Sequence, residues 1–123
     1  MFRDEINRLN MFLSKQLWMD FEMCSMGGSK LELHGFLDEA GDDKVIITFE
    51  FPYMVDGTFF FTYEGKGNFI SVIEGEEAYN LNIKYDIEQG NTLFKISNTN
   101  KSTDMIIAAK KISIEYISSE SGL

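Results

Sequence analysis

The amino-acid sequence predicts an α+β fold that is mostly β. One N-terminal amphipathic helix packs on an antiparallel meander of about eight strands, a half-barrel or sandwich. Two observations lead to this prediction. Apolar residues recur at helical spacing near the start of the chain and at a period of two over most of the remainder. Short turn signals separate the alternating runs and leave almost no room for crossover helices, which excludes a parallel βαβ topology.

The length and composition of the chain are those of one folded domain. It has 123 residues, of which 44% are hydrophobic and 14% aromatic. That is enough for one core without a disulfide or a metal, and too little for two cores. We therefore expect a single domain, 1–123, with the helix at about 3–18, the β-meander at about 20–117 and a frayed tail at 118–123.

Apolar residues near the start of the chain share one helical face, because they step by three or four positions along the sequence. They are Phe2, Ile6, Leu9, Leu13 and Leu17. Asp4 and Glu5 stand in the first turn, where the helix macrodipole favours negative charge. This pattern predicts a helix over 3–18 that covers one side of the sheet.

Alternation of apolar and polar residues predicts the strands. The alternating runs are 21–25, 31–37, 44–51, 53–55, 58–63, 69–73, 79–87, 92–96 and 111–117. The run 79–87 alternates strictly, which predicts a strand with one face in water. Asp56 and Gly57 predict a hairpin between the runs on either side of them. The apolar run 105–109 is too short to assign by its period.

The charge of the chain narrows the choice of partner. Asp and Glu number 20 against 11 Lys and Arg, which gives a formal net charge of −9. Phosphate binding needs Lys and Arg, so direct binding of nucleic acid is not expected, and membrane surfaces are disfavoured for the same reason. A negative field instead favours a basic protein partner and speeds encounter with it, although the same charge also serves solubility.

Cysteine use and the N-terminal residues bear on the cellular compartment. Cys24 is the one cysteine, so an intrachain disulfide cannot form. The first residues do not resemble a signal peptide, and no apolar run is long enough to cross a membrane. The expected location is the cytoplasm.

No residue pattern indicates catalysis, a metal or a cofactor. His34 is the one histidine, and it lacks the Cys/His spacing of a zinc site. Cys24 and His34 fall on neighbouring predicted strands. However, Glu22 and Glu32 beside them would raise the pKa of a thiol, which argues against a catalytic dyad. The acidic loop 38–43 lacks the register of an EF-hand calcium site. We expect a protein that is not an enzyme and has no cofactor.

Two features remain after these exclusions, aromatic density and acid in two turns. A small, acidic, β-rich chain without catalytic residues has the character of bacterial toxin-immunity proteins and phage-encoded inhibitors, although it carries no family motif. The first hypothesis is therefore a non-catalytic protein that binds and neutralises a basic protein, such as a toxin domain. The predicted contact residues are Asp38, Glu39, Asp42, Asp43, Tyr53, Tyr63, Glu74, Glu76 and Glu77.

Three alternatives stay open. The Phe and Met side chains would line a small β half-barrel that binds an apolar ligand. The many carboxylates would support acid–base catalysis only if their surroundings separated their pKa values, and the sequence shows no such asymmetry. An exposed sheet edge would make a structural or assembly subunit, and it would also allow self-pairing, so both a monomer and a homodimer are compatible with the sequence.

Overall fold

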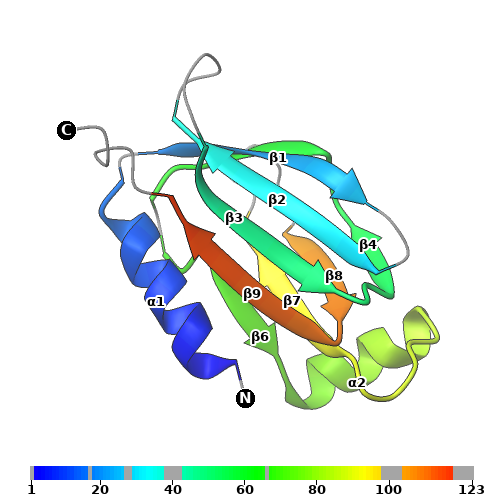
Figure 1. Ribbon diagram of the computed structural model, residues 1–123. Helices are drawn as coiled ribbons and strands as arrows, with labels where there is room; N and C mark the ends of the chain where they lie inside the picture. Colours follow the sequence, from blue (N-terminus) through cyan, green and yellow to red (C-terminus); the bar gives the residue numbers. More distant parts are fainter. Residues whose placement is uncertain are drawn as a thin grey trace.

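A computed structural model describes residues 2–16, 18–26, 29–37, 43–65, 67–97 and 104–117. Within these ranges the chain forms two helices, α1 (Arg3–Ser14) and α2 (Gly75–Lys84), and nine strands (Figure 1). The strands are β1 (Met19–Met26), β2 (Lys30–Phe36), β3 (Asp43–Glu50), β4 (Met54–Asp56), β5 (Phe60–Tyr63), β6 (Ile70–Ile73), β7 (Thr92–Ile96), β8 (Met105–Ala109) and β9 (Lys111–Tyr116). The tail predicted at 118–123 lies outside the described residues.

The strands form two antiparallel sheets that pack face to face (Figure 1). The first sheet has the order β5-β1-β2-β3-β9, and the second has the order β4-β8-β7-β6. The predicted class, α+β and mostly β with an N-terminal helix, is confirmed, and the architecture is that of a sandwich. The meander holds for β1-β2-β3 and for β6-β7-β8 only, because β5 returns to pair with β1 and β9 returns to pair with β3.

Phenylalanine fills much of the space between the sheets. Phe21 stacks on Phe69 with the ring centroids 4.6 Å apart, and Phe49 meets Phe94 edge-on with the centroids 5.3 Å apart. All four side chains are fully buried. Aromatic rings bury a large apolar area and prefer these offset and edge-on arrangements. Much of the aromatic density of the sequence therefore serves the core.

Helix α1 lies across one side of the sandwich, beside β9 of the first sheet and β6 of the second (Figure 1). It buries Ile6, Leu9 and Leu13 on the face that the sequence pattern predicted. The helix ends at Ser14 rather than at about 18, directly after the last residue of its buried face, and the predicted face residue Leu17 lies outside the described residues. A helix of this length takes its stability from such packing rather than from propensity.

The side chain of Asn10 closes the edge of β6. Its Nδ2 donates a hydrogen bond to the carbonyl oxygen of Ile70 at 2.8 Å, and its Oδ1 accepts one from the Ile70 N–H at 3.0 Å. An edge strand presents unpaired backbone groups to its surroundings. One amide side chain satisfies both groups of Ile70, as a neighbouring strand would.

The strand predicted at 79–87 is wrong, because most of this run belongs to helix α2. Ala78 and Leu81 pack against a small cluster formed by Ile73, Leu93 and Ala108. Glu76 and Glu77 in the first turn and Lys84 in the last complement the helix dipole. The apolar residues of the outward face, Tyr79 and Ile83, are exposed, and their spacing of four fits a helix as well as their alternation fits a strand.

The hairpin predicted at Asp56 and Gly57 is also wrong, because the strands on either side of it belong to different sheets. β4 pairs with β8, and β5 pairs with β1. Gly57 serves close packing instead of a tight turn: a Cβ at this position would lie 2.6 Å from side-chain atoms of Met105. The run 105–109, unassigned from sequence, is a strand between β4 and β7.

Candidate functional site

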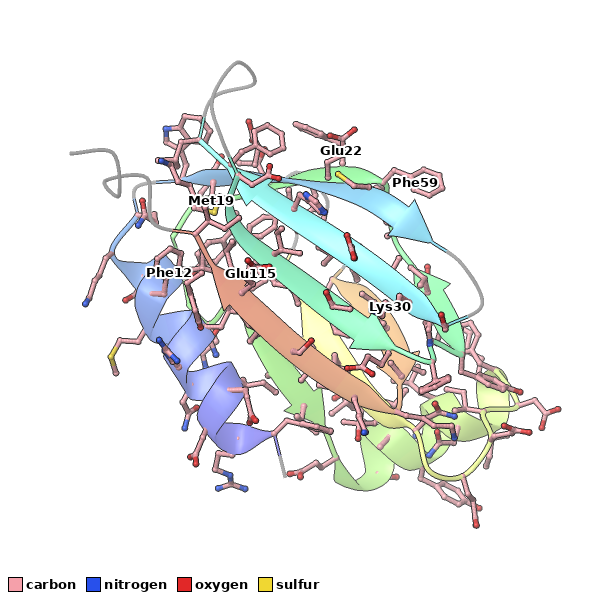
Figure 2. All side chains as sticks on the ribbon, in the orientation of Figure 1. Phe12, Met19, Glu22, Lys30, Phe59 and Glu115 are labelled. Carbon is pink, nitrogen blue, oxygen red and sulfur yellow. The ribbon has the colours of Figure 1, made fainter. Side chains whose placement is uncertain are left out.

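The outward side of the first sheet gathers carboxylates over neighbouring strands. Register places Glu22 of β1 between Phe60 of β5 and His34 of β2, and the same row continues to Glu115 of β9. We call the following residues the acidic face: Asp20, Glu22, Glu32, Asp43 and Glu115. The opposite end of the sheet is balanced, since Glu50 lies between Lys30 and Lys111 in register. Figure 2 shows Lys30 and Glu115 toward opposite ends of the sheet.

His34 lies within the acidic face with a carboxylate at each ring nitrogen. Nδ1 is 2.8 Å from Asp43 Oδ2, and Nε2 is 3.0 Å from Glu32 Oε1. Burial by itself lowers the pKa of the imidazole, but the hydrogen bonds to Glu32 and Asp43 and the negative charges of these carboxylates together outweigh it and hold the pKa above its ordinary value. The imidazolium form donates to both carboxylates, so this pair of contacts is the arrangement that the protonated ring favours.

The thiol of Cys24 has the surroundings of an unreactive cysteine. Burial, and then the charges of Glu22, Asp43 and Glu32, raise its pKa, whereas a nucleophilic thiol needs a lowered one. Both ring nitrogens of His34 already face carboxylates, so neither is left to take a proton from the thiol. No group of three or more His, Cys, Asp or Glu side chains in the described ranges is placed to hold a metal ion.

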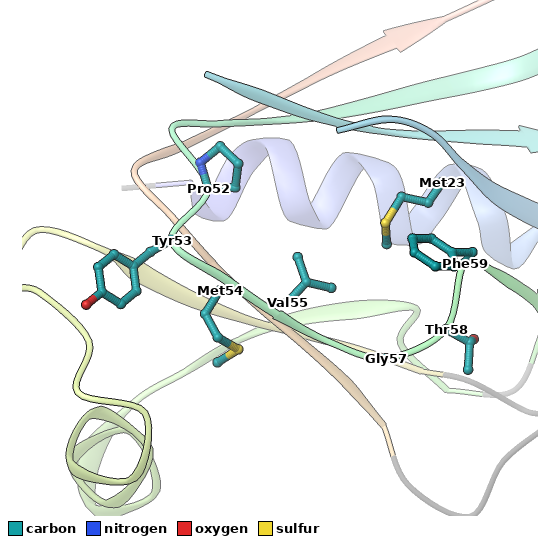
Figure 3. Close-up of a pocket in the computed structure, with 8 residues that line it drawn as sticks. All are labelled: Met23, Pro52, Tyr53, Met54, Val55, Gly57, Thr58 and Phe59. Carbon is teal, nitrogen blue, oxygen red and sulfur yellow. The ribbon is translucent and has the colours of Figure 1, made fainter. Parts of the chain in front are cut away.

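A hollow of about 350 Å³ opens at the side of the sandwich between β4 and β5, which we call the open edge. The side chain of Met23, from β1, lies beside Phe59 in its lining, and Val55 lies on β4 (Figure 3). Phe59 is 66% exposed, and Phe60 and Tyr53 are exposed as well. The complete lining is Met23, Pro52, Tyr53, Met54, Val55, Gly57, Thr58 and Phe59.

The acidic face and the hollow adjoin each other. The N–H of Met23 donates to the carbonyl oxygen of Phe59 at 2.7 Å, while the neighbouring residue Glu22 is paired in register with Phe60. Side chains alternate along a strand, so Glu22 points to the outward side of β1, with the acidic face, and Met23 points to the inward side, toward the hollow. Figure 2 shows Glu22 and Phe59 together at this edge of the sheet. One approaching molecule can therefore contact both features.

Two of the contact residues predicted from sequence belong to this surface. Asp43 is part of the acidic face, and Tyr53 lines the hollow with its hydroxyl donating to the Asp86 carbonyl oxygen at 2.6 Å. Tyr63 is corrected, because its side chain is only 1% exposed and its hydroxyl donates to the Gly67 carbonyl oxygen, so it cannot reach a partner. The predicted residues Asp38, Glu39 and Asp42 lie outside the described residues.

The predicted contact residues around α2 lie away from Asp43, which is the described residue of the predicted acidic loop 38–43. Glu74 precedes α2, and Glu76 and Glu77 form its first turn, at the end of the molecule opposite to Asp43 (Figure 1). Glu77 also forms an ion pair with Lys95 at 3.1 Å. The fold thus separates these glutamates from Asp43, although the sequence predicted that all of them contact one partner.

No protein-family model, no curated protein and no solved structure matches the chain. The helices in the described part of the chain are too short or too polar to cross a bilayer. The chemistry of the acidic face and of the hollow is thus what bears on function.

Proposed function

We propose that this chain is a non-catalytic cytoplasmic protein that binds and neutralises a basic protein, in the manner of bacterial toxin-immunity proteins and phage-encoded inhibitors. The observation that carries the proposal is the gathering of five acids on one side of one sheet, next to exposed aromatic residues. Within the described residues, the imidazole of His34 is the one basic side chain in contact with those acids.

The acidic face concentrates negative charge, which favours contact with a cationic molecule. Glu22 and Glu115 are exposed and lie in one row of the sheet, with His34 and Ile46 between them, so a basic molecule that covers this side meets both carboxylates. Complementary charge of this kind speeds association and suppresses wrong partners. Phe59 and Phe60 beside it are exposed aromatic residues, a residue type that is enriched at protein interfaces.

The test begins with the protein as bait in lysate of the organism that encodes it, at low and at high salt. A stoichiometric basic protein that is lost as salt rises fits the proposal. Its association rate is then measured with the double variant Glu22→Lys/Glu115→Lys and with the control Glu5→Lys/Glu88→Lys, which changes net charge equally on α1 and after α2.

We expect the double variant on the acidic face to slow association at low salt by roughly tenfold or more, and the control to slow it much less. Equal slowing by both variants would show that net charge alone steers the partner. Unchanged rates in both would remove the electrostatic basis of the proposal.

The hollow favours a second candidate, the binding of a small apolar ligand. Its volume of about 350 Å³ is at the lower end of the range for ligand pockets, and Met23, Val55 and Phe59 give it apolar lining. A mass above that of the chain in the native mass spectrum, lost on denaturation, would favour this candidate. A spectrum with the bare chain alone would count against it.

A further inference from the structure

We propose that the hollow at the open edge receives one large apolar side chain from the basic partner. This inference rests on the proposed function and adds to it the chemistry of the partner: a basic surface segment that carries an exposed apolar anchor residue. The acidic face would guide the segment, and the hollow would hold it.

The geometry of the chain produces the hollow. β4 and β5 are consecutive but belong to different sheets, so residues 57–59 cross from one sheet to the other at the open edge. No strand or helix of the described residues closes this side as α1 closes the other. Met23, from the inward side of β1, is thereby left only partly buried, with Phe59 beside it (Figure 3).

The size and lining of the hollow suit an anchor side chain. Hot spots at protein interfaces are large side chains inserted into such pockets, while surrounding contacts exclude water. Phe59, which is 66% exposed, gains burial only when another molecule covers it. Burial of apolar surface stabilises a complex by roughly 25 cal/mol per Å² before the costs of association.

Charge complementarity selects the occupant. The acidic face borders the hollow at Glu22, which precedes Met23 in sequence and is paired in register with Phe60, the residue after Phe59. Asp56, between the lining residues Val55 and Gly57, adds a carboxylate near the hollow, and this carboxylate accepts a hydrogen bond from the Tyr85 hydroxyl at 2.6 Å. Two copies of this chain meeting here would bring these acids together, each copy carrying a net charge of −9. A basic segment has the opposite charge, so it is the occupant that this border favours.

A library of random displayed peptides is the probe for this proposal, panned against the full chain. We expect the enriched peptides to combine several Lys or Arg residues with one large apolar residue. The affinity of one enriched peptide is then measured for Phe59→Ala and for the control Tyr79→Ala. Phe59 and Tyr79 are matched in exposure, at 66% and 64%, but Tyr79 lies on the outward face of α2.

We expect Phe59→Ala to weaken the peptide by roughly tenfold or more, and Tyr79→Ala by less than about twofold. Replacing the apolar residue of the peptide by Ser should cause a similar loss on the wild-type chain and little further loss on Phe59→Ala, since both changes remove the same contact. The methyl NMR signals of Met23 and Val55 should shift on binding.

The possible failures are distinguishable. Enriched peptides that are basic but lack an apolar residue, bound equally by Phe59→Ala and Tyr79→Ala and weakened by Glu22→Lys, would overturn the anchor and leave the proposed function in place. Apolar peptides that Glu22→Lys does not weaken would overturn both. Failure to enrich any peptide, or a dimer in light scattering that Phe59→Ala dissolves, would overturn the basic segment as the occupant.

Discussion

Both sides of the sandwich have a gap between the edges of the two sheets, but the chain covers this gap with a helix on one side only. On one side, between β9 and β6, helix α1 covers the gap with Ile6, Leu9 and Leu13, all buried. On the other side, between β4 and β5, a short crossing segment leaves Phe59 exposed next to a hollow. Apolar side chains stand at both sides, but the chain buries only one set itself. We therefore expect another molecule to bind on the side where Phe59 is exposed.

The edge strands of the two sides also differ in how their exposed backbone groups are covered. On the closed side the amide of Asn10 bonds both backbone groups of Ile70, at the edge of β6. On the open side the edge strand β4 has only three residues, and its length limits the template it offers to another strand. The open side is thus better suited to receiving a side chain than to adding a strand.

The largest expected change in the free energy of unfolding comes from a substitution on the closed side. Leu13→Ala removes a fully buried side chain that joins α1 to the core, and should lower the free energy of unfolding by about 2–5 kcal/mol. Phe59→Ala, on the open side, should change it by only about 0.5 kcal/mol, because the side chain is mostly exposed. Urea denaturation measures both. Similar losses in the two variants would mean that the open side is a structural part of the core.

A smaller effect is expected when the edge of β6 is uncovered. Asn10→Ala leaves the N–H and the carbonyl oxygen of Ile70 without their side-chain partner, and should cost about 1–2 kcal/mol in urea denaturation. Asn10→Asp keeps an acceptor for the N–H and should lose less. Hydrogen exchange at the Ile70 amide should rise in Asn10→Ala. Unchanged exchange there would contradict the edge-closing role of Asn10.

The smallest expected effect is a pH dependence of folding stability that comes from His34, within the acidic face that borders the open side. The pKa of His34 is raised in the folded chain above its ordinary value of 6.5, and Glu22 faces it in register in addition to Glu32 and Asp43. The contribution of His34 to folding stability is therefore fully present below about pH 6.5, the pKa of the unfolded state. It is lost as the pH rises through the folded pKa.

The variant His34→Gln cannot titrate, so its unfolding free energy is compared with that of the wild-type chain over this pH range. We expect the advantage of the wild-type chain to be largest at low pH and to shrink as the pH rises. An advantage that stays constant, or grows with pH, would show that the two contacts of His34 do not depend on its proton.

Local patterns in the sequence predicted those parts of the fold whose partners are near in sequence. The apolar face of α1 and the neighbouring strands β1, β2 and β3 follow from residue spacing. Helix α2 was mistaken for a strand because Tyr79 and Ile83 satisfy both periods, and only the packing of Leu81 decides between them. The pairings of β5 with β1 and of β9 with β3 have no local signal.

The candidate site was predictable to a smaller extent. Acid content indicated a basic partner, and Asp43 and Tyr53 were among the residues named. Glu22, Glu32 and Phe59 were not, because the sheet surface that brings acids together depends on non-local strand pairing. Alternation in 20–24 and 31–33 does signal that Glu22 and Glu32 point outward. The hollow has no such signal, since it forms where two consecutive strands separate into different sheets.

The placement of α1 has a consequence for the order of folding. α1 precedes every strand of the described chain, yet it packs on β9, the last of them. During synthesis the helix therefore leaves the ribosome well before part of its binding surface exists, and we expect the part of its apolar face that packs on β9 to stay uncovered until β9 has paired with β3. Closing such long loops is slow relative to forming hairpins. Completion of the closed side is thus a late event, in which the two ends of the described chain come together.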